Sequence, residues 1–201
     1  MSGSGDVALA AAIAALAAGE LVCFPTETTY GLAADIRRAD ALARLVALKG
    51  RDPNAPFATI AADAAQAAAL ARVFPPRAAA LAARHWPGPL TLVVPARADL
   101  APELVGPGRS VGVRVSSHPL ARALAAGIGG PITATSANPS GGAPALDVAE
   151  ARAYFGDRVA VYLDGGRLTP GASTVVSIDE LGGLRVLRPG PIEVDPRDRD
   201  A

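Results

Sequence analysis

The stretch "SVGVRVS" (residues 110–116) is the clearest guide to the fold, because apolar and polar residues alternate along it with the period of a β-strand. The residues of the apolar face are Val111, Val113 and Val115. Those of the opposite face are Ser110, Gly112, Arg114 and Ser116. An apolar face packs on a core and a polar face lines solvent or a cleft, so the stretch predicts a sheet with one core side and one polar side.

The rest of the chain predicts further strands and helices around this strand. Strands are expected at residues 21–24, 57–61, 90–94, 131–135 and 159–163, with a hairpin around residues 179–183. Helices are expected at residues 7–18, 40–49, 64–73, 76–85, 119–126 and 147–154, with Asp6, Asp40 and Asp147 as N-caps. Strands and helices intermix without a strict βαβ order, so we expect a mixed α/β (α+β) fold, a mixed sheet with helices packed on it.

The composition is that of one globular domain over residues 1–201. Half of the 201 residues are hydrophobic and only 4% are aromatic, so Ala, Val and Leu must fill the core. The 19 basic residues balance 19 acidic ones, which argues against a broad nucleic-acid surface and leaves room for a local anion site. Cys23, the lone cysteine, is interpreted as a core residue. No signal peptide or membrane span is evident, so a cytoplasmic protein is expected.

Several common chemistries are not supported by the sequence. His85 and His118 are the only histidines, and neither has a cysteine or carboxylate at ligand spacing, so no metal site is predicted. The sequence also lacks a Walker lysine loop, a GxGxxG turn after a strand and a GxSxG elbow. A bound nucleotide would have to be held by another device.

Two pairs of polar residues are candidates for holding a phosphate. Lys49 and Arg51 lie two apart at the end of an expected helix, where two cations can meet one phosphate group. Ser136 and Asn138 follow an expected strand and can donate hydrogen bonds to a phosphate or ribose. Taken alone, the first pair is more often a solvated helix end, and the second is more often a turn before Pro139.

Arg114 and the C-terminal hairpin supply further candidates. Arg114 lies on the polar face of a buried strand, so it needs either an internal salt bridge or an anion, and we weight the two equally. If the hairpin turn is centred between residues 180 and 181, Ser173 falls opposite Arg188, so that a hydroxyl and a guanidinium converge. One bulge would shift this register, and Arg188 would otherwise be a surface strand end.

Seven motifs, met in order, resemble the YrdC-like threonylcarbamoyl-AMP synthase family in its short, single-domain form. They are "FPTETTYGLAAD" (24–35), "LKGR" (48–51), "WPGPLTLVV" (86–94), "VGVRVSSHPLA" (111–121), "TSANPSG" (135–141), "STVV" (173–176) and "LRPGPI" (187–192). The resemblance implies a YrdC/RibB-like twisted mixed β-sheet with packed helices and a concave, positively charged cleft. It also implies an enzyme that condenses L-threonine, bicarbonate and ATP into threonylcarbamoyl-AMP and pyrophosphate, for N6-threonylcarbamoyladenosine in tRNA.

The resemblance assigns roles to individual residues. The family's catalytic set around the nucleotide phosphates corresponds here to Lys49, Arg51, Ser136 and Asn138. Further ATP contacts correspond to Ser110 and Arg188. The threonine site corresponds to Thr28, Arg114 and Ser173, with a backbone contact near Ala134. ATP is then a substrate that carries Mg²⁺ with it, and the product passes to a separate tRNA threonylcarbamoyl transferase complex.

The crowded polar stretch "CFPTETTYGL" (23–32) is only partly explained by the resemblance. Thr28 is the expected contact for the amino acid, and Glu27 and Tyr30 are expected to shape the same wall. Thr26 or Thr29 is expected to satisfy backbone groups of the loop.

Some positions depart from the family pattern and leave an alternative open. Asp52 separates Arg51 from the proline that often follows it, and "PFATIAAD" (56–63) lacks a histidine that many members carry. The sequence ends at Ala201, without room for the C-terminal domain of the longer subfamily. The alternative is a paralogue with an altered substrate or an RNA-binding role. The zero net charge and the lack of interleaved aromatic and basic residues argue against RNA as its main ligand.

Overall fold

The computed structural model describes residues 3–50 and 55–195. Its helices are α1 (Gly3–Ala17), α2 (Ala39–Lys49), α3 (Ala64–Ala68), α4 (Pro76–His85), α5 (Pro119–Gly127) and α6 (Val148–Phe155), with the short 3-10 helices η1 (Pro102–Leu104) and η2 (Gly156–Arg158). Its strands are β1 (Val22–Pro25), β2 (Tyr30–Ala33), β3 (Thr59–Ile60), β4 (Leu90–Pro95), β5 (Ser110–Arg114), β6 (Ile132–Thr133), β7 (Thr135–Ser136), β8 (Val161–Tyr162), β9 (Thr174–Ile178) and β10 (Leu184–Arg188).

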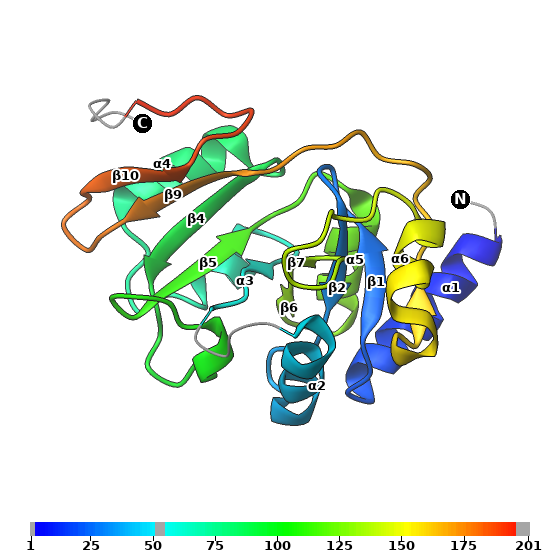
Figure 1. Cartoon of the computed structure of the whole chain (residues 1–201). Helices are drawn as coiled ribbons and strands as arrows, with labels where there is room; N and C mark the ends of the chain where they lie inside the picture. The colour runs from blue at the N-terminus through cyan, green and yellow to red at the C-terminus, as the bar shows by residue number, and fades with distance from the viewer. Residues whose placement is uncertain (1–2, 51–54, 196–201) are drawn as a thin grey trace.

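The strands form two mixed sheets (Figure 1), so the predicted mixed α/β class is confirmed, although two sheets replace the single one expected. The larger sheet has the order β10-β9-β4-β5-β3-β6, and β4 runs antiparallel to β5 and parallel to β9. The smaller has the order β7-β2-β1-β8. A bridge between Asp35 and Ile132 joins the sheets, and next to it the Thr133 hydroxyl accepts from the Ala34 amide and donates to the Leu32 carbonyl.

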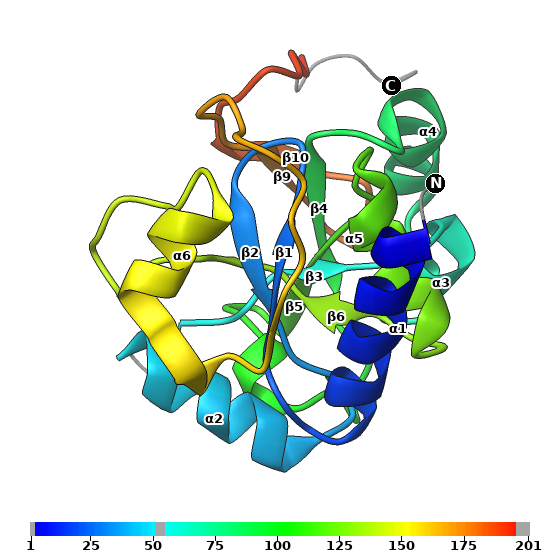
Figure 2. The same cartoon turned by 90° about the vertical axis from the view of Figure 1, so that its right-hand side faces the viewer.

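Helices cover both faces of the smaller sheet (Figure 2), with α1 and α5 on one side and α2 and α6 on the other. Alternate residues of β1 serve the two sides, because successive side chains of a strand point to opposite faces. Val22 and Phe24 belong to the core cluster under α1 and α5, whereas Cys23 belongs to the other cluster. Cys23 is fully buried, and burial raises the pKa of its thiol to about 12, so its interpretation as a core residue is confirmed.

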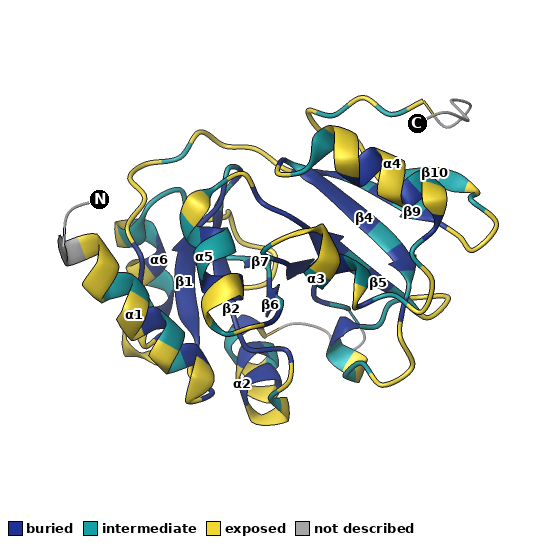
Figure 3. Cartoon of the chain, turned by 180° about the vertical axis from the view of Figure 1, so that it is seen from behind, coloured by how far each residue is buried: buried dark blue, intermediate teal, exposed yellow. Residues whose placement is uncertain are grey.

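Among the described helices, α4 packs against β4 of the larger sheet (Figure 3), and α5 contacts β3. The valines that the sequence placed on the core face, Val111, Val113 and Val115, are buried as predicted. Removing each from water contributes roughly 1.5–3 kcal/mol to stability. The opposite face of β4, β5 and β9 remains open, and this face carries the candidate site.

Two of the three predicted N-caps are wrong. Helix α1 begins at Gly3, so Asp6 lies inside its first turn. Arg38 occupies the N-cap of α2, because the Asp40 carboxylate instead accepts two hydrogen bonds from the Arg38 guanidinium. Asp147 caps α6 as predicted, since its side chain accepts from the Glu150 amide.

Several predicted strands and helices are shorter than expected. Helix α3 ends at Ala68, and the chain then forms backbone hydrogen bonds toward β4, with the Arg72 amide donating to the Pro95 carbonyl. The strand predicted over residues 131–135 divides into β6 and β7, because the Ala134 amide leaves the ladder to donate to the Ala58 carbonyl. Strand β2, which pairs antiparallel with β1, was not predicted.

Candidate functional site

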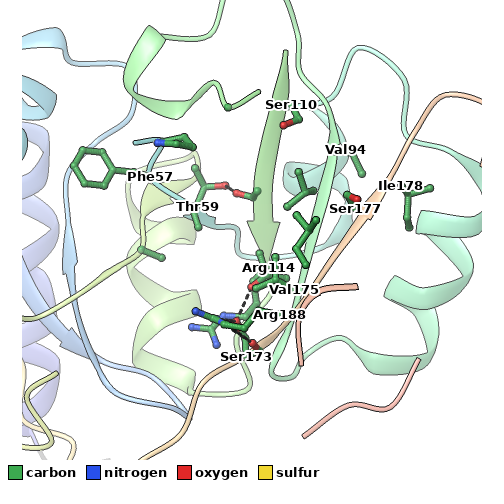
Figure 4. Close-up of a pocket in the computed structure, with 18 of the residues that line it drawn as sticks. Phe57, Thr59, Val94, Ser110, Arg114, Ser173, Val175, Ser177, Ile178 and Arg188 are labelled. Carbon is green, nitrogen blue, oxygen red and sulfur yellow. Dashed lines mark hydrogen bonds between the residues drawn. The ribbon is translucent and has the colours of Figure 1, made fainter. Parts of the chain in front are cut away.

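A pocket of about 1070 Å³ lies over the open face of the larger sheet. Its lining includes alternate residues of three strands, Thr91 and Val93 of β4, Ser110 and Arg114 of β5, and Val175 and Ser177 of β9, together with Ser173 just before β9. Figure 4 shows Arg114, Arg188 and Ser173 gathered at one end, with Ser110 and Val94 away from them. Since Ser110 and Arg114 are the two ends of β5, the pocket runs along about 13 Å of strand.

Arg114 makes the internal salt bridge that the sequence left open as one of two possibilities. Its Nη1 donates to Glu27 Oε1 at 3.2 Å and lies 3.4 Å from the Thr28 hydroxyl. The guanidinium also lines the pocket, and among the described residues its Nε and Nη2 have no hydrogen-bond acceptor. Burial lowers the pKa of Arg114 and the Glu27 charge opposes that shift. The salt bridge and the anion site are therefore compatible, because different nitrogens serve them.

The hydroxyls around Glu27 have different tasks. The Thr26 hydroxyl accepts from the amides of Thr28 and Thr29 and donates to the Thr29 carbonyl at 2.7 Å, so the prediction that Thr26 satisfies the loop backbone is confirmed. Thr28 lines the pocket, and its hydroxyl lies 2.9 Å from that of Thr26. Tyr30 is fully buried, which raises the pKa of its phenol to about 12.

The neutral Tyr30 hydroxyl holds the segment that leads to β9 in place through hydrogen bonds. It donates to the Gly166 carbonyl at 2.8 Å and accepts from the Gly165 amide at 2.9 Å. That segment continues to Ser173 at the pocket, so Tyr30 helps to fix the wall from behind rather than lining it.

Arg188 and Ser173 converge as predicted, but the predicted register is wrong. The hairpin pairs Leu184 with Ile178, which is already one residue away from the predicted register. A bulge between Val186 and Arg188 shifts the register once more, so Arg188 lies opposite Val175 rather than Ser173. The Arg188 side chain still reaches Ser173, where Nη2 donates to the hydroxyl and to the carbonyl, each at 2.9 Å. The Ser173 hydroxyl also lies 2.9 Å from that of Thr91, so it is held between two strands. Arg188 lines the pocket, and its Nη1 has no hydrogen-bond acceptor among the described residues.

Lys49, Ser136 and Asn138 form a second cluster, which we call the 136–138 turn cluster. Lys49 Nζ donates to the carbonyls of Ser136 and Asn138 at 2.7 Å each and to Asn138 Oδ1 at 3.2 Å. The Asn138 amide group donates to the carbonyls of Pro139 and Gly142, and the Ser136 hydroxyl donates to Asn138 Oδ1. Ser136 lines the pocket, whereas Lys49 and Asn138 do not. Arg51, with Asp52 beside it, lies outside the described residues.

Ser110 and Ala134 also line the pocket, and Ser110 lies away from Arg114 (Figure 4). The Ser110 hydroxyl donates to the Pro107 carbonyl at 2.9 Å, so it can still accept a hydrogen bond from a ligand. The Ala134 amide already donates to the Ala58 carbonyl at 2.8 Å. A backbone contact from Ala134 to a ligand would therefore use its carbonyl oxygen.

The positive charge of the pocket is concentrated at one end. Arg114 and Arg188 lie close enough for their charges to repel, since Arg188 contributes to the lowered pKa of Arg114. Toward the hairpin turn, Arg185 shares the lining with Asp179 and Glu180. The described residues contain no group of three histidine, cysteine or carboxylate side chains that could hold a metal ion. In the same residues no helix is long and apolar enough to cross a membrane.

Glu27 is the residue whose importance the sequence did not reveal. It was expected only to shape the wall, yet its two carboxylate oxygens accept from Arg114 Nη1 and from the Ser116 hydroxyl. These partners lie more than 85 residues away along the chain, with separations of 87 and 89. The only available signal was that Arg114 and Ser116 share the polar face of one strand. Two hydrogen-bond donors on this face indicate a carboxylate acceptor, but they do not indicate which one.

Comparison with known proteins gives a consistent result. The family model Sua5_yciO_yrdC, described as "Telomere recombination", matches residues 14–190. A protein of Halorhodospira halophila named threonylcarbamoyl-AMP synthase is 44% identical over 182 residues, which cover 90% of this chain and 86% of the relative.

Solved structures extend the comparison to the fold. P. abyssi Sua5 complexed with L-threonine is 35% identical with a TM-score of 0.85, and the match covers 90% of this chain. The chain spans about half the length of that protein, 54%. E. coli YciO, at 23% identity, has a TM-score of 0.83 over 96% of this chain and 93% of its own, which supports the fold alone.

Proposed function

This chain belongs to the Sua5/YciO/YrdC family, and we propose on that premise that it is an L-threonylcarbamoyl-AMP synthase acting in the synthesis of N6-threonylcarbamoyladenosine in tRNA. The observation that carries the proposal is the pair of guanidiniums, Arg114 and Arg188, held beside Ser173 at one end of a pocket of about 1070 Å³. Such an end suits a small amino acid, and the rest of the pocket leaves room for a nucleotide.

The reaction needs fixed positive charge more than a nucleophile on the protein. The amine of L-threonine combines with bicarbonate to give a carbamate and water. A carbamate oxygen then attacks the α-phosphorus of ATP, the bond between the α-phosphorus and the bridging oxygen breaks, and pyrophosphate leaves. Both reacting groups are anions, so cations and hydrogen-bond donors that hold them in line lower the barrier. This makes the proposed enzyme a nucleotidyltransferase.

We assign the amino acid to the guanidinium end of the pocket. Arg114 offers Nε and Nη2 to its carboxylate, which is the paired geometry that a guanidinium favours. Thr28 and Ser173 line the same end and are assigned to its remaining polar groups. Arg188 contributes charge where the amino acid meets the nucleotide.

We assign the nucleotide to the rest of the pocket. Ser110 and Ser136 line it, and Lys49 and Asn138 support the turn that presents Ser136. Arg51 is retained in the proposal as a phosphate contact because it follows Lys49 in the family motif. The described residues offer no group of three metal-ligating side chains, so Mg²⁺ enters the proposal as part of the Mg-ATP substrate.

The product of the proposed reaction is a labile adenylate, which has to be used soon after it forms. A tRNA threonylcarbamoyl transferase complex in the cytoplasm is the proposed recipient.

Pyrophosphate release from ATP by the purified chain tests the proposed function. Release that requires both L-threonine and bicarbonate is expected. L-serine is the matched control substrate, because it lacks one methyl group of L-threonine. Equal release with L-serine, or none with L-threonine, would contradict the assignment.

A further inference from the structure

Glu27 lies behind Arg114 as seen from the pocket. Its side chain is 15% exposed, and it is absent from the pocket lining, whereas Arg114 belongs to that lining. Glu27 therefore contacts the guanidinium from the side away from a ligand. A carboxylate so placed cannot contact the reacting atoms, and any effect on the reaction has to pass through Arg114.

A continuous series of hydrogen bonds connects Glu27 to the start of α5. The His118 amide donates to the Ser116 hydroxyl at 3.1 Å, and that hydroxyl donates to Glu27 Oε2. Glu27 Oε1 then accepts from Arg114 Nη1 at 3.2 Å. The Ser116 carbonyl is itself held by Arg122, whose Nη1 donates to it at 2.6 Å. Both oxygens of the carboxylate thus have fixed partners, and Glu27 has little freedom to turn.

The direction of the guanidinium is a consequence of this arrangement. An arginine has five N–H donors in one rigid plane, so fixing Nη1 limits where Nε and Nη2 can point. Without Glu27, the long side chain could rotate toward solvent or toward other acceptors in the pocket. Holding such a side chain in one rotamer before the ligand arrives removes part of the entropy cost of binding.

The charges at this end also favour one kind of ligand. Arg114 and Arg188 supply two positive charges, and Glu27 is the carboxylate that contacts Arg114. The end keeps one unbalanced positive charge, which matches a single carboxylate. A second negative charge, on the side chain of the ligand, would be repelled by the Glu27 carboxylate and would have no cation left to pair with.

We propose that Glu27, held in place by its hydrogen bond with Ser116, is a positioning residue that directs Nε and Nη2 of Arg114 toward the carboxylate of the amino-acid substrate. This inference rests on the proposed function and deepens it. Glu27 acts on the amino acid alone, because its contacts reach Arg114 and not the part of the pocket assigned to ATP.

Steady-state kinetics of three variants test the proposal. Glu27→Ala is expected to raise the KM for L-threonine at least about tenfold while the KM for ATP changes by less than about twofold. Glu27→Gln should give a smaller rise, because its amide oxygen can still accept from Nη1. Ser116→Ala should resemble Glu27→Gln. In a background of Arg114→Ala, adding Glu27→Ala should change the KM for L-threonine no further, because the residue through which it acts has gone.

Asp35→Asn is the matched control. Asp35 is also a buried carboxylate paired with an arginine, Arg37, at 2.7 Å, but it does not line the pocket. Asp35→Asn should lower the thermal midpoint of unfolding while leaving the KM values for L-threonine and ATP unchanged. Glu27→Ala with an unchanged KM for L-threonine, or with equal rises in both KM values, would overturn the inference. If that variant does not fold, Glu27→Gln decides by the same two criteria.

The positioning role and the proposed function can fail separately. A wild-type protein that releases pyrophosphate only with L-threonine supports the function, and the variants are then compared with it. If the wild type is active and the Glu27 variants match it, only the positioning role fails. If the wild type is inactive with L-threonine, the function fails and the role of Glu27 fails with it.

Discussion

The two polar clusters of the site differ in what they do with their donors. At the guanidinium end, Arg114 commits one nitrogen to Glu27 and keeps two for the pocket. In the 136–138 turn cluster, the Lys49 ammonium is surrounded by three oxygen atoms of Ser136 and Asn138. The first cluster is ready for an anion, whereas the second is organised around its own turn.

This difference shows that a residue can match a family motif without having hydrogen-bond donors that are already available to a ligand. A buried charge is stable when hydrogen bonds surround it, as with Lys49, or when it is shared between a fixed counterion and an open cavity, as with Arg114. Only the second arrangement offers donors without rearrangement. Mutations in the two clusters should therefore separate ligand binding from stability.

The largest effect is expected for Arg114→Ala. It removes the charge that we assign to the substrate carboxylate, so kcat/KM for L-threonine should fall by about two to three orders of magnitude, roughly 3–4 kcal/mol. Glu27 is left without its cation, so the thermal midpoint should fall too. Pyrophosphate release at varied L-threonine measures the first effect and a thermal melt the second. A fall in kcat/KM of less than threefold in a folded Arg114→Ala variant would contradict the view that the guanidinium end, unlike the 136–138 turn cluster, binds the substrate anion.

An intermediate effect is expected for Lys49→Ala. Three acceptor oxygens lose their cation, so the free energy of unfolding should fall by about 1–3 kcal/mol, and turnover should fall at least about tenfold as the turn loosens. Urea unfolding measures the free energy of unfolding, and ATP-dependent pyrophosphate release measures turnover. Arg44→Ala on the same helix is the control, because its exposed pair with Glu20 contributes little to stability. Wild-type turnover in a destabilised Lys49 variant would make this cluster purely structural.

The smallest effect is expected for Thr28→Val. Valine keeps the shape but loses the hydroxyl near Arg114 and Thr26, so the KM for L-threonine should rise about two- to fivefold, close to 0.5–1 kcal/mol, with kcat unchanged. Initial rates at saturating ATP measure it. The Thr26 turn keeps its backbone contacts, so stability should change little. A rise as large as that of Arg114→Ala would show that the hydroxyl, not the charge, holds the substrate.

Local patterns predicted the local parts of the site. The alternation around Val113 indicated which side of β5 is polar, and this placed Arg114 on the pocket face. The Asp147 cap could be predicted from its own neighbours. Ser173 and Arg188 meet for a different reason from the predicted one, because the long Arg188 side chain reaches Ser173 although the strand register is shifted.

The remaining features depend on contacts that no local pattern contains. Asp40 fails as a cap because Arg38, two residues earlier, competes for its carboxylate. Glu27 meets Arg114 only after the two sheets have packed together. Lys49 meets Ser136 and Asn138 only when α2 packs on the smaller sheet, because these two residues, at the end of β7 and just after it, lie 87 and 89 residues further along the chain. Sequence reasoning therefore placed Arg114 and Ser173 at the pocket, but it did not identify the partners of Glu27 or Lys49.

The buried thiol of Cys23 makes this chain convenient for site-specific labelling. The cysteine is the only one in the sequence, it is fully buried, and its pKa of about 12 leaves almost no thiolate at neutral pH. Maleimide reagents should therefore find no background site in the folded protein. Leu181, 98% exposed at the tip of the hairpin that ends in Arg188, is a natural place for an introduced cysteine. A fluorophore attached through Leu181→Cys would report nucleotide and amino-acid binding without removal of the native cysteine.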